Sequence, residues 1–213
     1  MPVVQKKSGL APPGGVGRLL LEASRRAEAM GLIDAHAGSH PRPHPGSQGD
    51  LAVFRHIARQ AGKAGIATAA ATAVHNVEPP TSEELAGLLK TMIAALEASP
   101  APAFEWGGLA RVLDAEHLAS LLNVSLSSLK RYQSGARTTP DSIAARLHFL
   151  ALVVGDLAGS YNDIGVRRWF QRKRTLLDGR APAQLLTGEW DPDDTGPRRV
   201  RELARELVTL SAT

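Results

Sequence analysis

The aromatic residues lie almost entirely in the second half of the chain, and this constrains where a tightly packed core can form. Of the nine aromatic residues, only Phe54 precedes position 104, and the other eight lie between Phe104 and Trp190. Because aromatic side chains bury large apolar areas, we expect the compact core in the second half. The first half is instead rich in Ala, Gly, Pro and Ser.

The composition excludes several classes of protein. The chain has 213 residues and no cysteine, so disulfides, thiolate metal sites and cysteine nucleophiles are excluded. No apolar run reaches the roughly 18 residues that a membrane span needs, and residues 1–15 lack the apolar core of a signal peptide. We therefore expect a cytoplasmic protein without a membrane partner. The net charge of +4 permits a nucleic-acid partner without requiring one.

The apolar residues recur at helical spacing and never alternate as in strands, so the predicted fold class is all-α. Residues 1–50 are predicted to form a flexible arm, a short helix over 16–30 that stops at Gly31, and a linker rich in Pro and Gly. Residues 51–103 are predicted to be helical. Within this region the low-complexity stretch 64–73 is expected to bury little, whereas 82–98 has the capping-box spacing of Thr81 and Glu84.

Residues 115–134 have the pattern of a helix-turn-helix. Ala119 is small enough for a close helix crossing, Asn123 can take the left-handed conformation that ends the first helix, and Ser125 can cap the second. The predicted inward-facing residues are Leu118, Leu122, Leu129 and Tyr132. The alternative interpretation is a helical hairpin with a polar face and no DNA contact.

The outward-facing side chains of this segment are the candidate DNA contacts. Hydroxyls and amides can meet base edges or phosphates, and cations can meet phosphates. Leu126 also points outward and can touch a thymine methyl group. The candidate DNA-binding residues are Ser125, Ser127, Ser128, Lys130, Arg131, Gln133 and Arg137.

A helix is predicted from Thr139, as N-cap, and Pro140, as first residue, to about residue 158. Its apolar residues cover both faces, which predicts that a partner or a second subdomain packs on it. This helix and the 82–98 helix are therefore the candidate dimerisation surfaces.

The C-terminal segment combines a short helix through Trp169, a basic turn at 172–174 and a turn at Asp178 and Gly179. A second short helix is predicted to begin at Pro182, and a further turn is expected from Asp191 to Pro197. The last helix presents Val200, Leu203, Ala204 and Leu207 on one face.

Two resemblances cover residues 104–213. The turn at Asn123 and Val124, the string Leu129-Lys130-Arg131-Tyr132-Gln133-Ser134-Gly135 and Pro140 resemble Xre-like helix-turn-helix regulators. Trp169, Leu177-Asp178-Gly179-Arg180, Pro182, Leu185-Leu186 and the terminal helix resemble the Xre/MbcA/ParS-type toxin-binding domain. The resemblance implies an Xre-like helix-turn-helix domain over 104–160 and a small helical toxin-binding-like domain over 161–213.

The resemblance also implies a function. Members of this class are antitoxins of type II toxin–antitoxin pairs, which cover the active site of a RES-type, NAD-consuming toxin and repress their own operon. It implies a RES-type toxin and double-stranded operator DNA as partners of a homodimer. The toxin-binding residues expected here are Trp169, Arg172, Arg180, Leu186, Trp190 and Thr213. For Trp169 and Trp190 the alternative is a place in the core, which is the commoner position of tryptophan, whereas one at the rim can anchor a partner.

Two further hypotheses remain open. The chain can be a stand-alone helix-turn-helix regulator that uses its first half for dimerisation or a ligand, or an adaptor whose helix-turn-helix binds only protein. Two other patterns have simpler interpretations. His36, His40 and His44 lie among prolines, which favours a linker over a metal site, and the aspartates at 191, 193 and 194 suit a turn. With no nucleophile–base pair or paired catalytic carboxylates, no enzymatic activity, cofactor or metal is expected.

Overall fold

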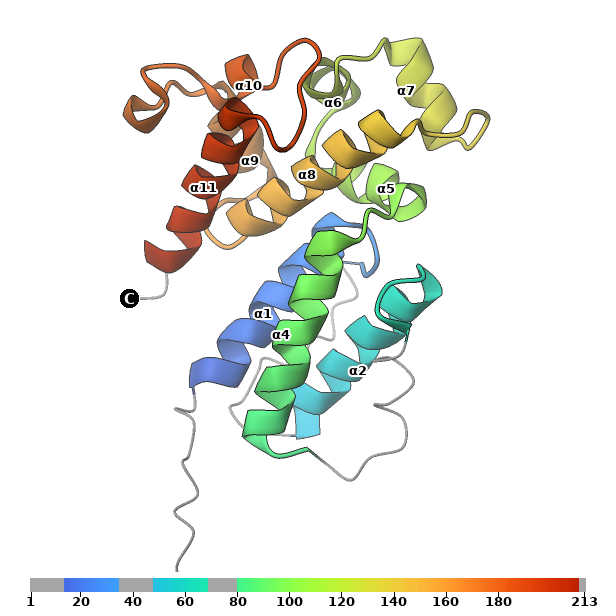
Figure 1. Ribbon diagram of the computed structural model, residues 1–213, viewed down its shortest axis with the longest axis vertical. Helices are drawn as coiled ribbons and strands as arrows, with labels where there is room; N and C mark the ends of the chain where they lie inside the picture. The colour runs from blue at the N-terminus through green and yellow to red at the C-terminus, as the bar shows by residue number, and fades with distance from the viewer. Residues whose placement is uncertain (1–13, 35–47, 69–79, 211–213) are drawn as a thin grey trace, which may run out of the picture.

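The computed structural model describes residues 14–34, 48–68 and 80–210, and these residues form an all-helical fold (Figure 1). The predicted all-α class is therefore confirmed. The predictions for the N-terminal arm, for the histidines at 36, 40 and 44 and for Thr213 lie outside the described residues. The helices are α1 (Gly14–Ala29), α2 (Gln48–Lys63), α4 (Ser82–Ala98), α5 (Pro102–Val112), α6 (Ala115–Leu122), α7 (Leu126–Gln133), α8 (Asp141–Leu157), α9 (Asp163–Gln171), the 3-10 helix η1 (Thr175–Leu177), α10 (Pro182–Leu185) and α11 (Thr195–Leu210).

The first half of the chain contributes fully to the core, so the prediction of a core confined to the second half is wrong. Phe54, Ile57 and Met30 are completely buried. The stretch 64–73, which was expected to bury little, is described only as far as residue 68, and within that part Ile66 is buried. Small and aliphatic side chains at helical spacing let α1, α2 and α4 pack side by side with Phe54 as their one aromatic residue (Figure 1).

The turn after α1 crosses α5 at backbone contact. Gly31 has a φ of +72°, which confirms the predicted stop, and any Cβ there would clash with the carbonyl oxygen of Phe104. Gly108 of α5 faces the same crossing, where a Cβ would clash with the carbonyl oxygen of Ala29. Two glycines therefore fix the first helix against the second half.

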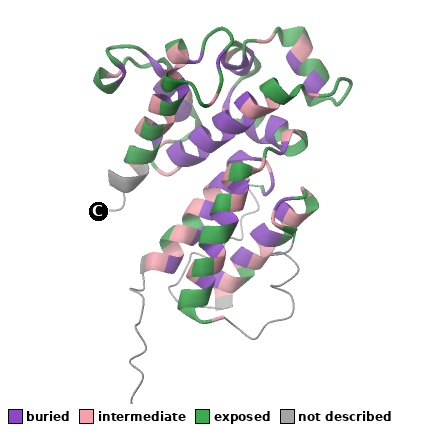
Figure 2. Cartoon of the chain, in the orientation of Figure 1, coloured by how far each residue is buried: buried purple, intermediate pink, exposed green. Residues whose placement is uncertain are grey.

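The α8 helix is the centre of the fold and is buried along most of its length (Figure 2). Its packing partners are α1, α5 and α11 of the same chain. The predicted covering of this helix is thus supplied internally, and the prediction that it forms a dimerisation surface is wrong. The prediction for 82–98 fails in the same way, because the apolar face of α4 packs on α1. The predicted capping box of Thr81 and Glu84 is present.

The start of α8 differs by one residue from the prediction. Pro140 is the N-cap, and the helix begins at Asp141. The Thr139 hydroxyl does not cap the helix, because it accepts a hydrogen bond of 3.0 Å from the indole N–H of Trp106.

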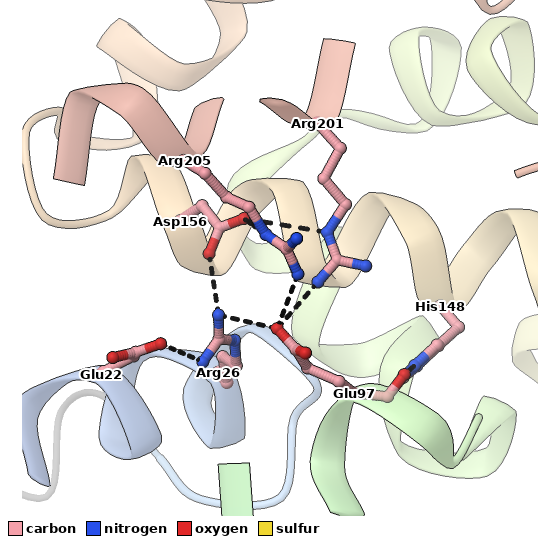
Figure 3. Close-up of polar contacts among 7 residues, drawn as sticks. All are labelled: Glu22, Arg26, Glu97, His148, Asp156, Arg201 and Arg205. Atoms are coloured by element: carbon pink, nitrogen blue, oxygen red, sulfur yellow. Dashed lines mark hydrogen bonds and ion pairs between the residues drawn. The ribbon is translucent and has the colours of Figure 1, made fainter. Parts of the chain in front are cut away.

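An ionic cluster joins α1, α4, α8 and α11 (Figure 3). It consists of Arg26, Glu97, Asp156, Arg201 and Arg205. Arg26 Nη2 lies 2.9 Å from Glu97 Oε1 and 3.4 Å from Asp156 Oδ1. Arg201 and Arg205 reach the same Glu97 oxygen at 3.1 and 2.8 Å. Burial raises the pKa of Asp156, although the three arginines act in the opposite direction.

Candidate nucleic-acid interface

The α6 and α7 helices are joined by a three-residue turn at the predicted position. Asn123 is left-handed, with φ 54° and ψ 49°, and its N–H donates to the carbonyls of Ala119 and Ser120. The Val124 N–H donates to the Ala119 carbonyl at 3.0 Å. The Ser125 hydroxyl accepts the N–H of Ser128 at 3.1 Å, so the predicted caps at Asn123 and Ser125 are confirmed.

The inner faces of these two helices are packed as predicted. Leu118, Leu122 and Leu129 are fully buried. Tyr132 stacks on Trp106 of α5, with ring centroids 5.9 Å apart and planes 16° from parallel. This contact anchors α7 to the core, so the direction of its outer face is fixed.

The outer face of α7 carries the predicted DNA-binding side chains. Six of the seven are exposed and Ser128 is half-buried. The Ser125 hydroxyl lies 3.0 Å from those of both Ser127 and Ser128, so the three serines form one group at the start of the helix. Leu126 beside them is 42% exposed.

The C-terminal end of α7 adds cationic residues to the same face. Lys130, Arg131 and Gln133 are exposed. The Arg137 guanidinium lies 5.4 Å from the centre of the Tyr132 ring, and its backbone N–H donates to the Arg131 carbonyl at 3.1 Å. The structure therefore brings all seven predicted residues together on one helix and the turn that follows it.

This face has no acidic neighbours in sequence. Residues 117–140 contain no Asp or Glu, whereas they contain Lys130, Arg131 and Arg137. Glu116 directly precedes this stretch, and Asp114 before it is the N-cap of α6. The Asp114 carboxylate accepts hydrogen bonds from the His117 N–H at 2.9 Å and from the His117 ring at 2.6 Å. These bonds lower the pKa of Asp114, and they tie its charge to the start of α6.

Three of the six predicted toxin-binding side chains are buried in the fold. Trp169, Leu186 and Trp190 are 1%, 0% and 5% exposed. The Trp190 indole donates to the Leu121 carbonyl at 2.9 Å, and its ring packs edge-on against Phe149. The prediction that these three form a contact surface is therefore wrong for the folded chain, and Trp190 instead holds the C-terminal segment on α6 and α8.

The other predicted toxin-binding residues are differently placed. Arg172 is exposed at the end of α9, Arg180 is exposed beside Asp178, and Thr213 lies outside the described residues. Two exposed apolar side chains were missed, namely Ile164 at 54% and Leu176 at 64%. The pair Leu176-Leu177 offered a signal, since adjacent residues of so short a helix cannot both face the core.

The remaining C-terminal predictions are largely confirmed. Asp178 and Gly179 are both left-handed, and α10 begins at Pro182. The turn expected from Asp191 to Pro197 is shorter, because α11 already begins at Thr195. Within that turn the Asp194 carboxylate accepts the Asp191 N–H at 2.8 Å, so these carboxylates serve the backbone.

Neither a metal-binding group nor a membrane-spanning helix occurs among the described residues. Among the residues that the structure describes, no three His, Asp or Glu side chains are grouped to hold a metal ion. No described helix is both long enough and apolar enough to cross a bilayer. Comparisons with protein families, curated proteins and solved structures gave no match to this chain.

Proposed function

We propose that this protein binds double-stranded DNA by placing α7 in the major groove, with α6 and α7 acting as a helix-turn-helix. The observation that supports the proposal is the outer face of α7, which lies in a stretch of sequence, 117–140, without Asp or Glu. The inner face of the same helix is held on the core by the stacking of Tyr132 on Trp106. An α-helix with its side chains is about 10–12 Å across, which fits a major groove about 12 Å wide.

The side chains divide into two roles on this proposal. Lys130, Arg131 and Arg137 contact phosphates and supply affinity that does not depend on sequence. The serine group, Gln133 and Leu126 meet base edges and supply sequence preference. Regulation of transcription, including repression of its own operon, follows when the preferred sequence lies in a promoter.

The test is DNA affinity as a function of salt concentration. Duplexes selected from a random pool are titrated with the full chain by fluorescence anisotropy. Exchanging Lys130 and Arg131 for Ala removes two phosphate contacts, so the slope of log affinity against log salt should fall by about 2, with at least tenfold weaker binding. The control Arg59→Ala/Lys90→Ala removes one Arg and one Lys, both exposed, from α2 and α4. Absence of binding by the unaltered protein at moderate salt would overturn the proposal and favour the protein-binding adaptor.

A second proposed function is neutralisation of a RES-type toxin through residues 161–213. It is supported by Ile164, a large apolar side chain that is 54% exposed on the first turn of α9. The protein is expressed with the product of its neighbouring gene, and cellular NAD is measured. Deleting residues 208–213 should restore toxin activity while DNA binding persists; retained neutralisation would exclude occlusion by the C-terminus.

The homodimer expected for such a regulator also stays a proposal. Sedimentation velocity of the free chain and of its DNA complex would measure it, since paired recognition helices read half-sites about one turn apart. A single chain per duplex would contradict it.

A further inference from the structure

The strongest concentration of positive charge in the chain lies outside α7, in α9 and the loop that joins it to α10. Residues 164–188 contain six Lys or Arg residues and one acidic residue, Asp178. This stretch alone has a formal charge of +5, while the whole chain has +4. The positive balance of the protein therefore comes from this segment.

The single acid in the segment is already paired. The Asp178 carboxylate accepts a hydrogen bond of 2.7 Å from Arg199 and lies 3.8 Å from Arg180. Both the hydrogen bond and the charge of Arg199 lower the pKa of Asp178. Its negative charge is thus balanced from α11, and it leaves Arg172 and Lys173 uncompensated.

The residues 172–180, here named the basic loop, have a fixed shape. Arg174 and Arg180 form an antiparallel bridge, with the Arg174 N–H donating to the Arg180 carbonyl at 3.0 Å. The Arg174 guanidinium lies 5.5 Å from the centre of the buried Trp169 ring. Arg172 and Lys173 at the start of this loop are exposed, and no ion pair involves them within the described part of the chain.

The basic loop begins beside the first helix of the proposed DNA-binding pair. The side chain of Gln171, the residue before the loop, contacts the ring of His117 on α6. Gln171 is the last residue of α9, and Arg167 of α9 donates to the Val112 carbonyl at 2.6 Å, which fixes α9 on the end of α5. In Figure 1 α6 lies between α7 and the loop that follows α9, all at the upper end of the molecule.

We infer that the basic loop is a second DNA-contacting surface, which binds the phosphate backbone beside the groove that α7 enters. The first helix of a helix-turn-helix crosses the backbone, so cations next to α6 are placed to extend that contact. On this inference the exposed cations of the loop meet phosphates, and phosphate contacts carry no direct sequence information, so the contribution of the loop is independent of sequence. This inference rests on the proposed DNA binding, and it assigns Arg172 and Lys173 to DNA.

The test compares Arg172→Gln/Lys173→Gln with Arg59→Gln/Lys90→Gln in the full chain. Each pair removes one Arg and one Lys, and all four side chains are exposed. The probe is a duplex of about 30 base pairs of random sequence, titrated by fluorescence anisotropy at several salt concentrations. The loop variant should bind about tenfold more weakly and lose about 1 to 2 from the salt slope, with the ranking of duplex sequences unchanged. The Arg172→Lys variant should bind like the unaltered protein.

The outcomes separate the two proposals. If the unaltered chain binds DNA and the loop variant matches it in affinity and slope, the inference is overturned and the role of α7 stands. If the unaltered chain binds no duplex, both are overturned. Weaker binding by the loop variant and the control alike would also overturn the inference, because it would show a general effect of net charge. A circular dichroism melt of each variant checks that the fold is unchanged.

Discussion

Replacing Glu97 by Gln tests whether the ionic cluster fastens the terminal helix to the rest of the fold. Glu97 lies near the end of α4, and one of its oxygens, Oε1, receives Arg26 at 2.9 Å, Arg201 at 3.1 Å and Arg205 at 2.8 Å (Figure 3). Gln has the same shape but no charge, so the substitution leaves Arg201 and Arg205 with Asp156 as their carboxylate in the cluster, while Arg26 keeps Asp156 and Glu22.

The size of the effect follows from the contacts. A hydrogen bond to a charged group contributes about 1.5–3 kcal/mol, so three such bonds set an upper limit of several kcal/mol. Three effects reduce it. The side chain of Glu97 is 29% exposed and that of Arg205 is 47% exposed, so water screens part of the attraction. The Gln amide oxygen still accepts one bond, and the repulsion between Glu97 and Asp156 disappears. We expect a loss of about 2–3 kcal/mol in the free energy of unfolding.

The assay is urea unfolding followed by far-ultraviolet circular dichroism at neutral pH. Glu206→Gln is the matched control, because Glu206 is an exposed residue of α11 outside the cluster. It should change the free energy of unfolding by less than about 0.5 kcal/mol. A Glu97→Gln loss no larger than that of the control would refute the reasoning, since the cluster would then contribute no more than scattered surface pairs.

Three further predictions concern stability. Gly108→Ala should lower the free energy of unfolding by about 2–3 kcal/mol, because its Cβ would meet the backbone of Ala29 and Gly31. Gly107 faces open space, so Gly107→Ala should leave the free energy of unfolding unchanged. Thermal melts of both variants check this. Asn123 has a φ of 54°, so Asn123→Ala should lower the free energy of unfolding by about 1 kcal/mol, whereas Asn123→Gly should not. Urea unfolding of both variants measures this, and equal losses would contradict the argument from conformation. Burial raises the pKa of Asp156 above its ordinary 3.8, so the folded state binds this proton more tightly than the unfolded state, and the stabilisation is lost as pH rises through the folded value. The stability of Asp156→Asn relative to the unaltered protein should therefore increase from about pH 4 to about pH 7, and a difference that stays constant with pH would exclude this effect.

The features that sequence reasoning predicted well are those decided within a few residues. The capping box at Thr81 and Glu84, the left-handed Asn123 and the Ser125 cap each depend on side chains that meet their own backbone. The inward and outward faces of α7 follow from helical spacing in the same way. The candidate DNA surface was therefore predictable almost completely.

The features that it missed depend on residues far apart in the chain. Trp169 and Trp190 were assigned to a surface because spacing alone does not show that the 190 loop docks on α6. The Asp156 carboxyl follows the apolar stretch 149–155 of α8, a position that indicates a buried partner. Nothing local identified that partner as Arg26, which is 130 positions away. The basic loop was visible as a run of cations, and only its contact with α6 relates it to DNA.

The burial of α8 has a consequence for how the gene can change. One side of this helix is covered by α1 from the first half, and others by α5 and α11 from the second. Exchange of the first hundred codons by recombination would uncover leucine and valine side chains at the centre of the fold unless the new segment reproduced α1. The two halves must therefore be inherited together, although only the second carries the proposed DNA-binding surface.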